Sequence, residues 1–182
     1  MTTIEIIQGC KAKKASYQKA LVVRFAPMLL SVCRRYAKNR SEADDVLQET
    51  LIRIFRSLDS FSPEKGVFEA WIRTIAVNAS LKYFDKNCFT KQIIGLEELP
   101  HTPVEPSIYS QLQVDEMMKM VASLPEGYRQ VFNLYVIEGY SHKEISQLLK
   151  IGESSSRSNL ARARNILKTI MLENEIVNHE FR

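Results

Sequence analysis

The chain has 182 residues, of which 45% are hydrophobic and 25% charged, and its formal net charge is +4. This length allows one large domain or two small ones, and the composition is typical of a globular protein. No apolar run approaches the roughly 20 residues that span a bilayer. Residues 1–5 lack the basic and apolar segments of a signal peptide. We therefore expect no membrane insertion and a cytoplasmic location.

Charge is distributed unevenly along the chain. Residues 1–86 carry a net charge of +6, residues 87–122 carry −3, and residues 123–182 carry +1. Within the last segment, the stretch 150–168 holds five basic residues against one acidic residue. This order predicts two modules that face nucleic acid, with a segment between them that avoids the duplex.

The Cys, His and Ser residues of the chain do not have the spacing of a metal site or a catalytic site. Cys10, Cys33 and Cys88 are far apart, and no histidine lies at ligand spacing from them. We expect free buried thiols, no metal and no cofactor. Ser141 and His142 are sequence neighbours, which is a poor nucleophile–base arrangement. Since a Gly-rich phosphate loop is also lacking, we expect no catalytic residue, no small-molecule substrate and no enzymatic activity.

Apolar residues recur at helical spacing in the first half of the chain. The pattern predicts helices over residues 15–38, 42–58 and 68–84. We expect Ser41 to cap the second helix, with Asp44 in its acidic first turn.

The periodicity is lost over residues 87–112, where three prolines and three glutamates indicate a linker. Helices resume near Val114, and three more are predicted over 126–137, 141–149 and 154–172. Strand-type alternation is nearly absent. The predicted fold class is therefore all-α.

We expect two small helical domains joined by a flexible acidic linker. The first domain covers residues 8–88, the linker 89–112 and the second domain 113–175. The second domain contains the most informative pattern in the chain.

Two short helices around a turn form that pattern. Ser141 and Glu144 make a capping box at the start of the first helix, and we expect Gly152 to supply the positive φ of the turn. The second helix carries a cluster of positive charge. This is typical of a helix-turn-helix, which places a recognition helix in the DNA major groove.

The predicted recognition helix has an outward face of hydroxyl and basic groups. Hydroxyls at a helix start can donate to phosphates, while Arg and Asn can pair with guanine and adenine edges. A basic, solvated helix in an ordinary bundle is the alternative interpretation. The candidate DNA-binding residues are Ser154, Ser155, Arg157, Ser158, Asn159 and Arg162.

A second candidate surface lies on the predicted helix 42–58. Asp45, Gln48, Glu49 and Ile52 share the face opposite the apolar stripe. An aliphatic side chain among polar neighbours is typical of a protein interface, and the acidic groups favour a basic partner. A solvated face with one exposed isoleucine is the alternative.

A third candidate site surrounds the loop broken by Pro63 and Gly66. Phe61 precedes this loop, and Asn78 and Lys82 are four residues apart on the following helix. An aromatic ring with a polar and basic helix face would suit an unstacked base and a single-strand backbone. On that helix, core packing is the favoured role of the residues at helical core spacing, which are Phe68, Trp71, Ile72 and Ile75.

In order, these segments resemble a known family. The motifs are Asp-Asp-Val-Leu-Gln-Glu-Thr, Phe-x-x-Trp-Ile with Ile-Ala-Val-Asn, the acidic linker, Leu-Pro-x-x-x-Arg, and Gly-Tyr-Ser-x-x-Glu-Ile with Arg-Ala-Arg. Together they resemble the small two-domain bacterial RNA polymerase sigma factors of the extracytoplasmic-function (ECF) type. The resemblance covers roughly residues 10–172, and the order of the motifs is more specific than any one of them.

The resemblance implies a promoter-specificity subunit that binds core RNA polymerase, directs initiation at specific promoters and helps to melt the DNA. The first domain would bind the clamp helices of the largest polymerase subunit, and the linker would run toward the active-site cleft. An anti-sigma factor is a common partner in this family, although no residue here identifies one. The implied polymerase contacts are Asp44, Asp45, Gln48, Glu49 and Ile52.

The resemblance also implies two DNA contacts. Phe61, the loop 62–67 and Asn78 would capture an unstacked base of the minus-ten element, and the helix-turn-helix would read the minus-thirty-five element. The chain departs from the usual family pattern in the recognition helix, where Ser156 replaces an aliphatic residue and Asn159 a frequent Arg. Because Asn favours adenine where Arg favours guanine, the second change bears on promoter preference.

A stand-alone transcription regulator is the rival interpretation. Such a protein would use the same helix-turn-helix without polymerase, typically as a dimer on a palindrome. It would leave the face of Asp45, Gln48, Glu49 and Ile52 without a role.

Overall fold

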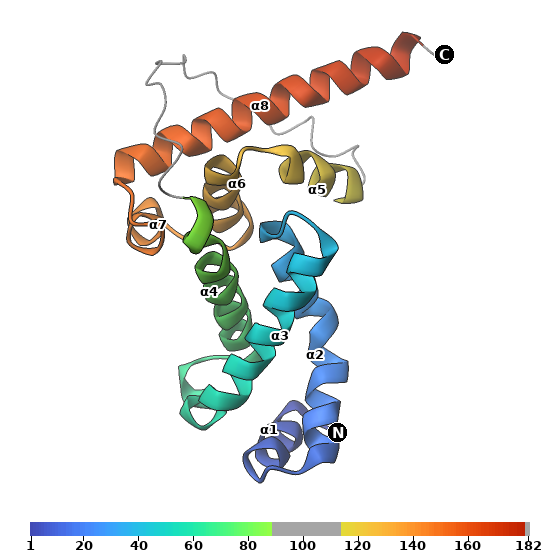
Figure 1. Cartoon of the computed structure of the whole chain (residues 1–182), viewed down its shortest axis with the longest axis vertical. Helices are drawn as coiled ribbons and strands as arrows, with labels where there is room; N and C mark the ends of the chain where they lie inside the picture. Colours follow the sequence, from blue (N-terminus) through green and yellow to red (C-terminus); the bar gives the residue numbers. More distant parts are fainter. Residues whose placement is uncertain (89–113, 181–182) are drawn as a thin grey trace. The chain divides into compact units, whose positions relative to one another are not determined.

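The structure is a computed structural model that describes residues 1–88 and 114–180 (Figure 1). All regular elements within these residues are helical, which confirms the predicted all-α class. The chain divides into two compact units, Met1–Asn87 and Cys88–Arg182. The predicted acidic linker, 89–112, lies outside the described residues.

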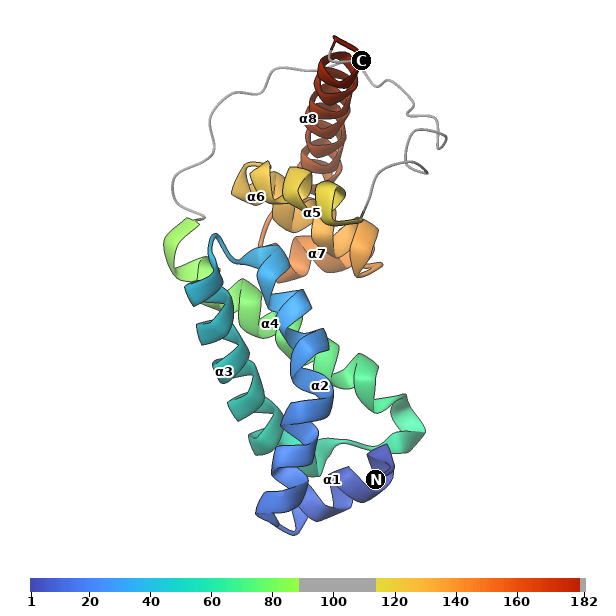
Figure 2. The same cartoon turned by 90° about the vertical axis from the view of Figure 1, so that its right-hand side faces the viewer.

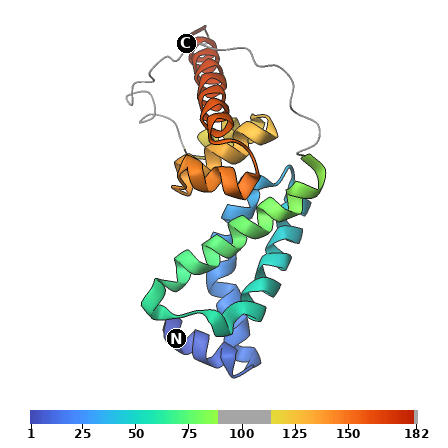
Figure 3. The same ribbon diagram turned by 90° about the vertical axis from the view of Figure 1, so that its left-hand side faces the viewer.

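The first unit consists of four α-helices and two short 3-10 turns. Its elements are α1 (Thr3–Lys11), α2 (Ala15–Tyr36), α3 (Arg40–Ser57), η1 (Leu58–Ser60), η2 (Pro63–Lys65) and α4 (Phe68–Cys88). Helices α2 and α3 pack side by side, and α1 packs against α2 (Figure 2). Figure 3 shows α4 crossing α2. The three helices predicted here are confirmed, whereas α1 was not predicted.

The apolar stripe of α2 forms the centre of this unit. Residues spaced three and four apart along one face of α2 are buried, because that spacing returns to the same side of a helix. They are Leu21, Phe25, Leu29, Val32 and Tyr36.

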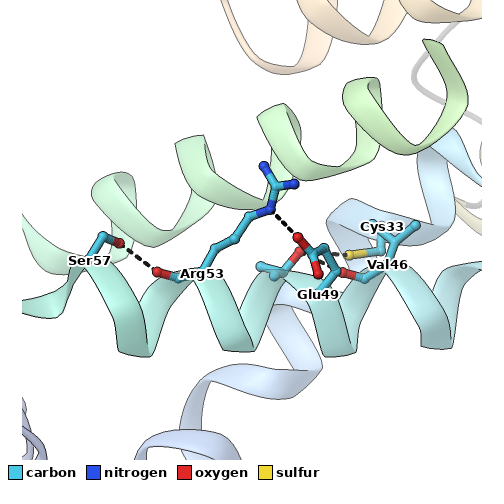
Figure 4. Close-up of polar contacts among 6 residues, drawn as sticks. Cys33, Val46, Glu49, Arg53 and Ser57 are labelled. Carbon is cyan, nitrogen blue, oxygen red and sulfur yellow. Dashed lines mark hydrogen bonds and ion pairs between the residues drawn. The ribbon is translucent and has the colours of Figure 1, made fainter. Parts of the chain in front are cut away.

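Free cysteines lie within this core, as predicted for Cys10 and Cys33. The Cys33 sulfur lies 4.0 Å from the Thr50 hydroxyl, which donates to the Val46 carbonyl at 2.7 Å (Figure 4). Burial raises the pKa of the Cys33 thiol, so the protonated form is favoured. The side chain of Cys88 lies outside the described part.

The start of α3 differs from the prediction that Ser41 is its cap. The helix begins at Arg40, and the cap is Asn39, whose side-chain oxygen accepts from the Glu42 N–H at 2.9 Å. Glu42 in turn accepts from the Lys38 N–H at 2.9 Å. Asn caps a helix as well as Ser does, so the earlier residue takes the role and Ser41 falls inside the helix.

The second unit is built around a long C-terminal helix. Its elements are α5 (Val114–Ser123), α6 (Glu126–Phe132), the π-helical turn η4 (Asn133–Ile137), α7 (His142–Leu149) and α8 (Glu153–Glu180). Helices α5, α6 and α7 all pack against α8. Helix α8 continues well past the predicted end at residue 172.

The turn between α7 and α8 is formed differently from the prediction. The capping box of Ser141 and Glu144 is confirmed, but the residue with positive φ is Lys150 (φ 53°), not Gly152. The Lys150 and Ile151 N–H groups both donate to the carbonyl of Ser146, in the last turn of α7, and these bonds terminate the helix. The chain therefore changes direction at Lys150, before it reaches Gly152.

None of the helices that the structure describes is both long and apolar enough to cross a membrane.

Candidate functional sites

The exposed face of α3 carries the predicted polymerase contacts. Asp45, Gln48 and Ile52 are exposed on successive turns of one side of the helix, while Asp44 and Glu49 are half-buried. Ile52 keeps 44% of its surface exposed although most aliphatic residues of α3 pack inward. The isoleucine is thus an apolar centre within a polar surface, as the sequence predicted.

Two contacts hold the acidic side chains of this face. Glu49 forms an ion pair with Arg53 one turn later, at 2.7 Å (Figure 4). The Tyr83 hydroxyl of α4 donates to an Asp45 oxygen at 3.4 Å. Partial desolvation and the nearby Asp45 carboxylate raise the pKa of the exposed Tyr83, so its hydroxyl stays protonated and available as a donor.

Tyr83 is a residue of this face that the sequence did not indicate. It is exposed, and it lies 38 residues along the chain from Asp45, its partner. Only the packing of α4 beside α3 brings the two together. The aromatic ring beside the Asp45 carboxylate adds an apolar element to the face besides Ile52.

The third candidate site differs from the prediction in one respect: Phe61 is in the core. Its side chain is only 8% exposed. Its ring packs at 5.1 Å from Phe68 and 5.4 Å from Trp71, measured between centroids. Core packing therefore describes Phe61 better than base stacking.

The loop after Phe61 and one face of α4 remain accessible. Residues 63–67 are exposed, and Gly66 adopts a φ of 145°, which side chains with a Cβ rarely adopt. Asn78 and Lys82 are both exposed and four residues apart on α4, as predicted. They place an amide and an ammonium group on one face of the helix.

The predicted recognition residues all lie in the first three turns of α8. Ser154, Ser155, Arg157 and Ser158 are exposed, whereas Asn159 is half-buried. The Ser158 hydroxyl donates to the Ser155 carbonyl at 3.0 Å, and Arg157 pairs with Glu153 at 3.2 Å. Such an exposed i, i+4 pair contributes little to stability, so Arg157 can exchange Glu153 for a phosphate or base at small cost.

Arg162 is held by a residue from another helix. Its guanidinium donates to the Tyr128 hydroxyl of α6 at 3.2 Å, and its side chain is half-buried. A guanidinium offers five N–H donors in a rigid fork, and this bond helps to set its direction. Tyr128 is thus a supporting residue that the sequence pattern did not reveal.

A polar contact inside the helix-turn-helix was also not predicted. Ser156 is fully buried, and its hydroxyl lies 2.9 Å from Nδ1 of His142, the first residue of α7. The His142 ring stacks on Tyr135 of η4, with centroids 4.5 Å apart and planes at 22°. Three successive elements of the unit therefore meet at this histidine.

The fold and these sites define a helical protein of the sigma-70 class. The sequence model described as Sigma-70 region 2 matches residues 21–88, and the one described as Sigma-70, region 4 matches residues 115–167. The first match contains the α3 face and the loop, and the second contains the helix-turn-helix.

Curated relatives narrow this class to one family. The ECF RNA polymerase sigma factor SigM of Bacillus subtilis is 30% identical over 147 residues, which cover 79% of this chain and 86% of SigM. SigE of Mycolicibacterium smegmatis, also an ECF sigma factor, is 29% identical over 165 residues, 88% of this chain. That alignment covers 63% of SigE, so this chain spans less than two thirds of it. The chain belongs to the ECF RNA polymerase sigma factors.

A solved structure shows the same fold. The sigma factor RpoE of Bartonella quintana, crystallised with the anti-sigma factor NepR, is 21% identical to this chain. The superposition covers 85% of this chain and 96% of that one, with a TM-score of 0.51.

Proposed function

We propose that this protein is a promoter-specificity subunit that binds core RNA polymerase and directs DNA-templated transcription initiation. The main support is that one chain presents two separate surfaces. One is the face of α3 with Ile52 among acidic groups, and the other is the exposed, basic start of α8. A stand-alone DNA-binding protein needs only the second. The family assignment supports the same conclusion, because the two faces fall in the two matched regions.

The polymerase contact is proposed for α3. Asp44, Asp45, Gln48, Glu49 and Ile52 would meet the clamp helices of the largest subunit. Acidic groups around an exposed aliphatic side chain suit a basic partner with an apolar recess, since the anchor supplies affinity and the charges supply orientation and rate.

Promoter DNA would be contacted by both units. The loop 62–67 with Asn78 and Lys82 would take an unstacked base of the minus-ten element. The start of α8 would read the minus-thirty-five element through Ser154, Ser155, Arg157, Ser158, Asn159 and Arg162. Phe61 has no place in this proposal as a base contact, because its ring is buried. Its role is to anchor the loop.

The two DNA contacts would act together. Each is weak alone, but polymerase tethers them on one promoter, so the second contact forms at a high effective concentration. Capture of a flipped base offsets a few kcal/mol of unstacking for each step. The protein would supply binding energy and no bond chemistry. We assign the functional domains to residues 8–88 and 113–175, and the site of action to the cytoplasm.

Binding to core polymerase followed by run-off transcription tests the proposal. Purified full-length protein is incubated with core RNA polymerase, and the complex transcribes a pool of genomic fragments. We expect a stable complex and new transcripts, whose start sites reveal both promoter elements. Sequence-specific DNA binding without core association would instead establish a stand-alone regulator.

An anti-sigma factor is a further proposed partner. The solved relative RpoE was crystallised with one. Affinity capture with the full chain, followed by competition with core polymerase, tests this. A captured protein that displaces core polymerase would support the proposal, and one that binds jointly with it would contradict it.

A further inference from the structure

The two helices of the helix-turn-helix are joined by one buried polar contact. His142 opens α7 and Ser156 lies in the first turn of α8. Their side chains meet at 2.9 Å, and Ser156 has no exposed surface. A buried hydroxyl without a partner is costly, so its hydrogen bond constrains where the two helices can lie.

The His142 ring has a fixed orientation. One face stacks on Tyr135 at 4.5 Å between centroids, and Nδ1 points to the Ser156 hydroxyl. Burial, then the positive charge of Arg157, lowers the pKa of His142, with Arg164 in the same direction and Glu153 opposing. The neutral ring is favoured, and Nδ1 of neutral imidazole can accept a hydrogen bond from the Ser156 hydroxyl.

Ser156 lies in the middle of the residues proposed to contact DNA. Ser155 and Arg157 flank it in sequence, and both are exposed. Adjacent helical residues differ by about 100° around the axis. When Ser156 points inward to His142, its two neighbours are therefore turned outward on either side. A small rotation of α8 would break the hydrogen bond and move both neighbours together.

Apolar packing alone does not fix this rotation as tightly. Ile145 of α7 and Leu160 of α8 are buried in the same unit. Contacts between such side chains are non-directional and tolerate small shifts, whereas a hydrogen bond weakens steeply when its angle changes.

We propose that Ser156 and His142 are positioning residues that set the rotation of α8 against α7 and thereby place the DNA-reading side chains of α8. This inference rests on the proposal that α8 contacts the upstream promoter element. It assigns a role in promoter affinity to two residues that do not themselves reach the bases.

Holoenzyme binding to two promoter duplexes tests this. One duplex carries both promoter elements found by run-off transcription, and the other has its upstream element scrambled. The variants are Ser156→Ala, His142→Phe, which keeps a ring against Tyr135, and His142→Asn, whose amide replaces Nδ1. The double variant Ser156→Ala/His142→Phe completes a double-mutant cycle, which measures the coupling between the two side chains.

We expect Ser156→Ala and His142→Phe each to weaken binding to the intact promoter about threefold to tenfold, the range of one hydrogen bond. The double variant should lose no more than either single variant, and His142→Asn should restore most of the affinity. None of them should change binding to the scrambled duplex or to core polymerase. A purely structural role would not give rescue by asparagine.

Two results would overturn the inference. One is unchanged promoter affinity in Ser156→Ala, and the other is losses that multiply in the double variant. If Ser156→Ala lowers the folded fraction in thermal unfolding, the promoter affinities of His142→Phe and His142→Asn still test the inference. Equal affinities of these two variants would overturn it. A wild-type holoenzyme that does not distinguish the two duplexes would instead refute the proposed upstream contact.

Discussion

The rings of Phe61 and Phe68 lie 5.1 Å apart, edge to face, at the two ends of the loop 62–67. Both side chains are buried, and Phe68 also packs against Phe25 of α2 at 5.4 Å. The loop is therefore tied to the core at both ends. Its own side chains, including Val67 with 66% exposure, remain available to a ligand.

Replacing Phe61 with alanine is expected to destabilise the first unit by about 3–5 kcal/mol, the usual cost of truncating a buried phenylalanine. Denaturant unfolding of the full chain, followed by tryptophan fluorescence of Trp71, measures this. Val67→Ala, in the exposed part of the same loop, should change stability by less than about 0.5 kcal/mol. Equal stability of the two variants would show that Phe61 is not a core residue.

Helical periodicity was sufficient to predict most elements of this fold. The buried stripe of α2 repeats over 22 residues, so its period is clear in the sequence. The nine-residue helix α1 was missed although Thr2 and Glu5 form a capping box of the kind that marked the eight-residue α7. The cap at Asn39 and the left-handed Lys150 were also missed. Ser41 and Asn39 are equally good caps, so the sequence does not separate them, and Gly152 adopts a positive φ more readily than Lys150 does.

The candidate sites could be predicted only where one helix carries the whole pattern. Ile52 was recognised because its neighbours on α3 define a polar face. The inward turn of the Phe61 ring depends on Phe68 and Trp71, and sequence spacing does not give a ring's direction. The contacts of Tyr83 with Asp45 and of His142 with Ser156 join different helices, so they require the packing itself.

Replacing Ile52 with lysine is expected to weaken core polymerase binding at least about tenfold, since a charge replaces the apolar centre of the proposed interface. Stability should be unchanged because the side chain is 44% exposed. Biolayer interferometry with immobilised core polymerase measures the affinity. Val23→Lys on α2, a residue with 69% exposure, is the matched control and should bind normally. Unchanged affinity of Ile52→Lys would remove Ile52 from the proposed interface.

Replacing Arg162 with alanine is expected to cost about 1–3 kcal/mol of holoenzyme binding at the upstream element, the range for an arginine that reads a base. Tyr128→Phe should cause a smaller loss in the same direction, because it removes the 3.2 Å hydrogen bond that holds Arg162. Competition with scrambled duplex is the control. An equal loss on scrambled DNA would make Arg162 a phosphate contact.

Replacing Lys150 with glycine is expected to stabilise the second unit by about 1 kcal/mol. Lys150 has a φ of 53°, a conformation that costs a residue with a Cβ about 1–2 kcal/mol and glycine very little, while glycine loses more entropy on folding. Thermal unfolding of the full chain measures the change. Lys150→Ala keeps the Cβ and should have nearly wild-type stability. Stabilisation by alanine equal to that by glycine would show that the lysine charge, not its φ, is responsible.

His142 should make the stability of the second unit depend on pH. Its pKa in the folded chain is lowered from 6.5, first by burial and then by Arg157. The unfolded chain therefore binds a proton more readily than the folded one. The contribution of neutral His142 to the free energy of unfolding is therefore present above pH 6.5. It is lost as pH falls through the lowered pKa of the folded chain. The charged groups that act on the ring are Arg157, Glu153 and Arg164, and the ring stacks on Tyr135.

Denaturant unfolding between about pH 7.5 and 5.5 should therefore show a fall in the free energy of unfolding that is absent from His142→Phe. The window stays above the range in which Glu144 titrates, since the capping bonds from Ser141 lower its pKa from 4.5. The variant is expected to be less stable than the wild type at pH 7.5, and the difference should shrink as pH falls. Parallel pH profiles for the two proteins would show that His142 does not stay neutral in the folded unit.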